Sequence, residues 1–446
     1  MTINAFTLKE LRQLVRTKSI AVSLITFLFV ALAIAYAVPV FGGMRQNTGE
    51  SMFLGINSLL ALMLCVVLPS ELFSFLDKER GSAKEHADFT MLTALPPSEV
   101  IDGKLRGAFA IMALFSTAAL PFGVLSYLMH GITFLQMLRM LICTLCISCM
   151  LSHSVLVIAA MNVPRIVRRC IYALFLFATI AFLLAGGSVV REISASGSVL
   201  WKLVFVAVTV CMVARGLAIS LFASSVMERD CPLRLSVLAA TLGWLWFALV
   251  SRSGSAMLMW FVATTVGSLL LAAYSLAQPL GYSRRMLASR PRNLLLRGLF
   301  FPFSSAAVNG FVFACIIGAI SVAVKKIAGP AQSPLADARA TATFLMYAFS
   351  VLLFTRWVWR IFFSRRFPAI LVPLLAGGLF VFLQTIPPYI GLGGDVGEFA
   401  ATPFYCPGIL AEPRTHLVQS AIAFSISFGL NFITSIIAAI IRARRK

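Results

Sequence analysis

Long apolar runs recur along the whole chain and are separated by short polar connections. An α-helix rises 1.5 Å per residue, so about 20 apolar residues cross the hydrocarbon layer of a membrane. The runs are continuously apolar rather than alternating, which excludes the strands of a membrane barrel. The pattern predicts an all-α polytopic membrane protein with about twelve transmembrane helices, at about 20–42, 51–75, 107–129, 133–162, 170–190, 200–226, 235–251, 255–279, 302–324, 340–358, 367–391 and 417–441.

Composition agrees with this pattern. Of 446 residues, 60% are hydrophobic and 12% are charged, against roughly 45–50% and 25% in soluble domains. The connections between the runs leave no room for a large soluble domain.

The distribution of Lys and Arg predicts the orientation. A net charge of +21 can indicate nucleic acid, anionic lipid or the positive-inside rule. Alternate connections hold 27 and 8 basic residues, and Arg139 and Arg215 lie within spans. We therefore predict that both termini are cytoplasmic, and no nucleic acid is needed to explain the charge.

The cysteines and histidines do not predict a catalytic or metal site. Only Cys406 falls on the predicted outer side, so no structural disulfide is expected. Three cysteines and one histidine share one face of the fourth span, a pattern that could indicate a metal cluster. Small residues at this spacing are also common where membrane helices pack closely, and we adopt this interpretation. These residues are Cys143, Cys146, Cys149 and His153.

The spans divide into two halves of six, 20–228 and 229–446. A long cytoplasmic connection occurs at matching positions in each half, at 76–106 and at 280–299. The outer connection 391–415 is rich in Gly and Pro. This correspondence predicts two-fold pseudo-symmetry, as in many transporters, on topology alone.

The segment before the first span, 1–19, is amphipathic. Its apolar stripe lies opposite its cations, which predicts a helix lying flat on the cytoplasmic face. The alternative is an ordinary basic flank that orients span one. The apolar residues are Leu8, Leu11, Leu14 and Val15, and the cations are Lys9, Arg12 and Arg16.

The connection 76–106 reads as a short polar helix with an apolar end, stopped by Pro96-Pro97. Its charge and its protruding Phe89 suit docking to a soluble partner. A solvated loop helix without a partner is the alternative, and the residues alone do not separate the two.

The first 130 residues or so resemble a known family. The leader Leu-Lys-Glu-Leu-Arg (8–12), two spans, and a charged loop ending in Leu-Pro-Pro-Ser-Glu-Val-Ile-Asp-Gly-Lys (95–104) are similar to permease subunits of type-2 ATP-binding-cassette exporters. The resemblance implies that 1–19 is an elbow helix and that the loop contains a coupling helix seated in an ATPase subunit. It implies the docking residues Glu85, His86, Asp88, Phe89, Leu92 and Leu95.

Two features depart from that family. Such permeases usually have six spans per chain and dimerise, whereas twelve are predicted here. No second elbow precedes span seven, where the connection is too short. The chain is therefore either a fused pseudo-dimer with a diverged second half or a subunit of a homodimer, and 391–415 would match the outer hairpin of the family.

ATP chemistry is expected on another chain. The phosphate-binding pattern Gly-x-x-x-x-Gly-Lys-Ser/Thr is absent, since Gly103-Lys104 is followed by Leu105. We therefore predict a permease that is not itself an enzyme, binds no cofactor of its own, and uses ATP through a nucleotide-binding partner subunit. Its predicted location is a bacterial cytoplasmic (inner) membrane, in contact with membrane lipids.

The main alternative is a twelve-span secondary carrier of the major facilitator type. The stretch 75–81 weakly resembles the Asp-Arg-x-Gly-Arg loop of that family. Ion-coupled carriers generally need an acid inside the membrane, and Glu71 alone qualifies among the predicted spans. Arg215, near the middle of span six, could meet an anionic substrate or Glu71, or snorkel to the interface. Glu71 and Arg215 are therefore candidate pathway or gate residues, and Arg139 a membrane anchor.

Overall fold

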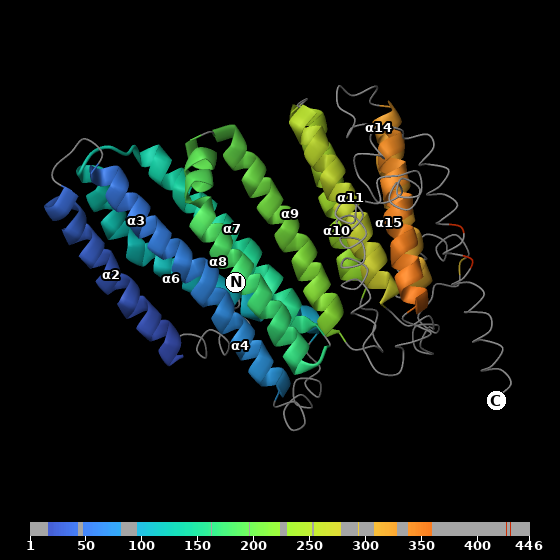
Figure 1. The fold of residues 1–446 in the computed structure, drawn as a ribbon, viewed down its shortest axis with the longest axis horizontal. Helices are drawn as coiled ribbons and strands as arrows, with labels where there is room; N and C mark the ends of the chain where they lie inside the picture. The colour runs from blue at the N-terminus through green and yellow to red at the C-terminus, as the bar shows by residue number, and fades with distance from the viewer. Residues whose placement is uncertain are drawn as a thin grey trace, which may run out of the picture. The chain divides into compact units, whose positions relative to one another are not determined.

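The computed structural model describes residues 17–42, 48–81, 96–161, 163–195, 197–223, 230–251, 254–277, 307–327 and 338–358, with single residues 293, 425 and 429. Every regular element in these ranges is helical (Figure 1). Eight helical segments there are long and apolar enough to cross a membrane, which confirms the prediction of a helical membrane protein. The predicted span 367–391, nearly all of 417–441 and most of the predicted elbow lie outside the described residues, so the number twelve stays a prediction.

The chain forms two compact units, Met1–Ala223 and Ser224–Lys446. In the first unit the helices are α2 (Lys18–Gly42), α3 (Thr48–Leu62), the π-helix η1 (Met63–Val67), α4 (Leu68–Gly81), α6 (Pro97–Leu128), α7 (Phe134–Ala160), α8 (Arg165–Ala195) and α9 (Gly197–Phe222). In the second they are α10 (Cys231–Ser251), α11 (Gly254–Leu276), α14 (Ala307–Ile327) and α15 (Ala338–Val358).

Helix α7 is the centre of the first unit, because α4, α8 and α9 all pack against it. A second layer is formed by α2, α3 and α6, with Phe27 of α2 meeting Phe115 of α6 edge to face at 5.8 Å. Both rings are almost fully buried. The helices of the first unit enclose several apolar clusters, and the one that includes this ring pair joins α2, η1, α4 and α6.

The π-helix η1 interrupts the long segment from α3 to α4. A π turn disrupts the regular backbone pattern, and such turns are frequent at functional sites. Here the carbonyl of Leu64, within η1, accepts a hydrogen bond of 2.8 Å from the Ser148 hydroxyl of α7. One turn away, the Thr144 hydroxyl donates to Asn57 Oδ1 at 3.2 Å. Small polar side chains thus fix the irregular turn against α7.

Helix α6 begins about ten residues earlier than the predicted third span, which starts at about 107. Pro96 has extended backbone angles (φ −64°, ψ 143°) and Pro97 occupies the first turn, where a missing N–H costs nothing. The helix therefore includes Asp102 and Lys104. Lys104 is almost fully buried with Nζ 4.2 Å from the centre of the Phe75 ring, a favourable cation–π contact.

The turn from α6 to α7 is fixed tightly against α3. His130 and Gly131 have positive φ angles of 65° and 94°, and Thr133 with Gln136 forms a capping box that starts α7. The Gly49 amide donates to the His130 carbonyl at 3.0 Å. A Cβ at Gly49 would lie 2.2 Å from that carbonyl oxygen, so only glycine fits.

The second unit has its own polar centre. Arg234 and Asp230 are both almost fully buried and form an ion pair of 3.1 Å, and the Tyr274 hydroxyl donates to the same carboxylate at 3.3 Å. Gly310 of α14 passes close to this group, since a Cβ there would lie 2.6 Å from Ser275 Cβ. These contacts hold α10, α11 and α14 together.

Candidate functional site: a groove between α6, α7 and α9

A groove of about 600 Å³ runs between α6, α7 and α9 in the first unit. Most of its lining is apolar, with side chains such as Phe109, Met112 and Leu145. Residues that carry thiol, imidazole, hydroxyl and guanidinium groups also line it. These come from Ser116, Cys146, Cys149, His153, Cys211 and Arg215.

Arg215 of α9 lines this groove and pairs with Asp102 of α6. Nε and a terminal nitrogen each lie 2.6 Å from a different carboxylate oxygen, which is a bidentate ion pair. The side chains of Arg215 and Asp102 are 44% and 25% exposed. An arginine on a membrane-spanning helix is expensive without such a partner. The pair links the helices on two sides of the groove.

Glu71 has a different neighbour from the one considered on the sequence. Its carboxylate accepts a hydrogen bond of 2.5 Å from the Ser19 hydroxyl, at the start of α2. Glu71 does not line the groove. The two candidate pathway residues are therefore not brought together: Arg215 lines the groove, and Glu71 ties α4 to α2.

A second ion-pair network joins α4 to α8. The Asp77 carboxylate is 5% exposed and accepts hydrogen bonds from Arg168, through Nε at 3.1 Å and through a closer terminal nitrogen, and from Arg169 at 2.9 and 3.1 Å. Arg165 is more distant, 3.7 Å away. The ring of Phe73 also stacks on Tyr172 at 4.0 Å. Asp77 thus connects α4 to α8 through several charged hydrogen bonds.

Both networks flank the predicted coupling loop. Asp77 precedes residues 82–95, which lie outside the described part of the chain, and Asp102 follows them. The predicted docking residues fall in this stretch, so the structure does not test their placement; they are Glu85, His86, Asp88, Phe89, Leu92 and Leu95. What the structure describes is how the two ends of the loop are held, by α8 on one side and α9 on the other.

The expectation that Glu71 is the only acid within a span is wrong. The span Pro97–Leu128 contains Glu99 and Asp102, because α6 starts at Pro97, and the span Thr48–Asp77 contains Glu50 and ends at Asp77. The carboxylates of Asp77 and Asp102 are paired with arginine. The segment around the loop is polar in sequence, and no local pattern shows that Asp77 and Asp102 pair with arginines of α8 and α9.

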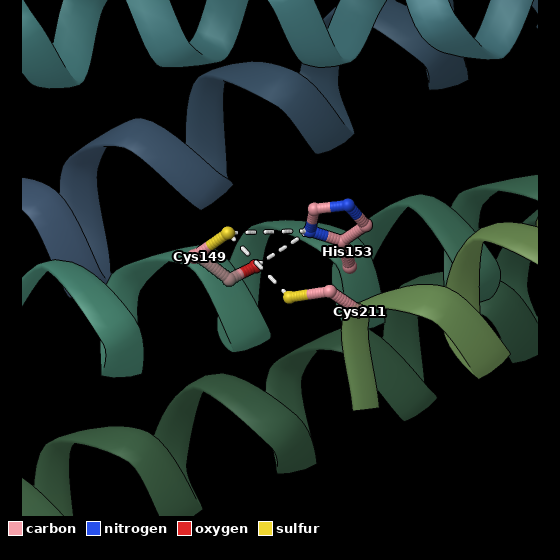
Figure 2. A group of neighbouring side chains, drawn as sticks. All are labelled: Cys149, His153 and Cys211. Carbon is pink, nitrogen blue, oxygen red and sulfur yellow. Dashed lines mark hydrogen bonds between the residues drawn. The ribbon is translucent and has the colours of Figure 1, made fainter. Parts of the chain in front are cut away.

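Three metal-ligating side chains converge in the groove. Cys149 and His153 come from α7 and Cys211 from α9, and Figure 2 shows all three pointing toward one another. The sulfur atoms of Cys149 and Cys211 lie 3.5 Å apart, and Cys149 Sγ lies 3.8 Å from His153 Nδ1. The same Nδ1 lies 2.8 Å from the Cys149 carbonyl oxygen.

Helix periodicity explains one part of this cluster and tertiary packing explains the other. Residues four apart share a helix face, which brings Cys149 next to His153. Cys211 is aligned with them because α9 packs closely on α7 through small buried residues, Ala207, Ala214 and Ala218. Sequence reasoning placed Cys149 and His153 on one helix face but interpreted that face as packing. It missed Cys211, because no local pattern shows which helix the face of Cys211 will contact.

No protein-family model, curated protein or solved structure matches the chain.

Proposed function

We propose that this chain is the membrane-spanning permease of an ATP-driven exporter, in which the groove forms part of the substrate pathway and a separate ATPase subunit docks on the loop 76–106. The observation that carries the proposal is the mechanical connection of that loop. Its N-terminal side is clamped to α8 through Asp77, and its C-terminal side is joined to α9 through Asp102. A force applied to the loop would therefore reach two membrane helices through ion pairs.

The connection to α9 leads directly to the groove. Arg215 bonds Asp102 and lines the groove, and it lies one turn along α9 from Cys211. When the loop moves, α6 would carry Asp102 with it, and the bidentate pair would transmit this movement to α9. The groove would then widen or narrow with the state of the docked ATPase.

The connection to α8 makes the other end of the loop rigid. Besides the ion pairs of Asp77, the Tyr172 hydroxyl donates to Ser70 Oγ at 2.7 Å while its ring stacks on Phe73. Buried, multiply bonded contacts of this kind resist bending. Helices α4 and α8 would therefore move as one body when the loop is displaced.

External energy coupling fits three acids of the first unit, Glu71, Asp77 and Asp102. A proton-driven carrier needs a membrane carboxylate that exchanges its proton during transport. Asp77 and Asp102 already serve as ion-pair partners, and Glu71 is hydrogen-bonded to Ser19. The sequence contains no phosphate-binding loop, so the ATPase is assigned to another chain.

The experiment is a co-purification with substitutions in the loop. Phe89→Asp should abolish recovery of a nucleotide-binding subunit with the affinity-tagged chain, because a charge at an apolar docking tip would be buried without a partner. The matched control is Phe362→Asp, in the predicted cytoplasmic connection 356–366. Both variants should elute from size exclusion as the unmodified chain does.

Two outcomes would contradict the proposal. One is equal recovery of the subunit with both variants. The other is transport by the purified chain alone down a proton gradient, which would replace the proposal with the carrier alternative.

A further inference from the structure

We propose that Cys149, His153 and Cys211 form a Zn²⁺ site that opens into the groove. This inference is independent of the exporter proposal, because it rests only on the geometry and chemistry of the three side chains. Within the part of the chain that the structure describes, their ligand atoms all lie within 4.8 Å of one another.

The distances are close to those that a tetrahedral Zn²⁺ imposes. With bonds of about 2.3 Å to sulfur and 2.0–2.1 Å to nitrogen, two sulfur ligands lie about 3.8 Å apart, and sulfur and nitrogen about 3.6 Å apart. The corresponding distances here are 3.5 Å between the sulfur atoms and 3.8 Å between Cys149 Sγ and His153 Nδ1. The third distance, between Cys211 Sγ and the His153 ring nitrogen, is within 4.8 Å, so side-chain rotations would bring the three atoms around one ion. Figure 2 shows the three side chains.

Hydrogen bonds hold the metal-free cluster in place. The Cys211 thiol donates to Cys149 Sγ, and Nδ1–H of His153 donates to the Cys149 carbonyl at 2.8 Å. Binding through Nδ1 breaks the hydrogen bond to the Cys149 carbonyl and moves the single imidazole proton from Nδ1 to Nε2, and the two thiols lose their protons. The step is therefore Zn²⁺ plus two thiols giving a dithiolate complex plus two protons.

Charge and ligand type favour Zn²⁺ over other ions. Thiolate and imidazole ligands select zinc or copper(I) over magnesium or calcium. Two thiolates carry a charge of −2, which Zn²⁺ neutralises completely, whereas Cu⁺ would leave an uncompensated negative charge among apolar helices. The nearby Arg215 does not offset it, because Asp102 already neutralises that cation.

The fourth coordination position would face the groove. All three residues line it, so an ion held between them would lie next to the groove. Three protein ligands and one open position are typical of zinc sites that bind a further ligand, whereas structural sites have four protein ligands. The site would thus hold an exchangeable ion or one that binds a donor atom of a molecule in the groove.

The test is metal binding to the full-length chain in detergent, kept reduced with a phosphine so that Cys149 and Cys211 stay thiols. In competition with a chromophoric chelator, we expect one tightly bound Zn²⁺ per chain. When Co²⁺ replaces Zn²⁺, the absorption spectrum should show thiolate charge-transfer bands and the visible bands of a tetrahedral ion. Cys149→Ser, Cys211→Ser and His153→Ala should each weaken binding by more than about 100-fold, since even the outer partners of metal ligands are worth about 10–100-fold.

The matched control is Cys146→Ser, because Cys146 lines the same groove one turn before Cys149 but is not part of the cluster. Its Zn²⁺ affinity should equal that of the unmodified chain. The inference is overturned if the folded, reduced, unmodified chain binds no Zn²⁺, if it binds Cu⁺ but not Zn²⁺, or if Cys146→Ser weakens binding as much as Cys149→Ser. The unmodified chain decides the first two outcomes, so a variant that fails to fold does not prevent the test.

Discussion

Replacing Asp77 by Asn should destabilise the first unit strongly. Asn keeps the size of the side chain but removes the charge that holds two arginines. Asp77 and Arg168 are 5% and 6% exposed, so the substitution leaves a buried guanidinium without its counter-charge. Breaking a buried ion pair by removing one partner costs about 3–5 kcal/mol.

The arginines of the same network should rank by burial. Arg168→Met removes a buried cation but leaves Asp77 bonded to Arg169, so its cost is that of lost charged hydrogen bonds, about 1.5–3 kcal/mol. Arg165 is 48% exposed and 3.7 Å from the carboxylate. Arg165→Met should therefore cost about 0–1 kcal/mol, as exposed pairs do, and it is the matched control.

Thermal unfolding in detergent measures this ranking. Cys65 and Cys143 are buried and become reactive on unfolding, so a thiol-reactive fluorophore reports the transition. For a unit the size of Met1–Ala223, each kcal/mol shifts the midpoint by about 2–4 °C. Asp77→Asn should lower it by about 6–20 °C and Arg165→Met by less than about 4 °C. Equal shifts for these two variants would refute the reasoning.

Further substitutions test other contacts of the first unit. Gly49→Ala should lower the unfolding midpoint, because its Cβ would lie 2.2 Å from the His130 carbonyl oxygen. Gly123→Ala is the control and should shift the midpoint little, because its Cβ would meet the methyl end of the flexible Met137 side chain at 3.3 Å. Asp102→Asn should leave the ATPase docked but uncouple ATP hydrolysis from transport. The double variant Asp102→Arg with Arg215→Asp should restore part of the coupling. If Asp102→Asn alone keeps full coupling, this ion pair does not transmit the movement of the loop.

The helical membrane class could be read from the sequence because it depends on length and composition. An apolar run of about 20 residues has few stable alternatives in lipid, and α2, α7 and α9 follow the predicted spans within a few residues at most boundaries. The start of α6 was less predictable. Pro96-Pro97 marks a boundary, but the polar residues that follow do not show by themselves that they belong to the membrane helix.

The chemistry of the groove depends on contacts that sequence does not encode locally. Cys149 and His153 are one helical turn apart and were recognised as sharing a face. Cys211 lies 62 residues further along the chain, and its alignment depends on the packing of α9 on α7. The same holds for Arg215, whose partner Asp102 is separated from it by 113 residues.

The central claim is that this chain forms the substrate pathway and that a separate ATPase subunit supplies the energy for transport. Native mass spectrometry of the complex, purified from its own membrane, tests this claim most directly. The account predicts one copy of the 48.4 kDa chain with two copies of a soluble nucleotide-binding subunit, both lost when Phe89→Asp is introduced together with a charge in the loop 280–299. Two chains with two ATPases would contradict the pseudo-dimer. A chain that carries no ATPase in gently solubilised membranes would contradict the claim itself.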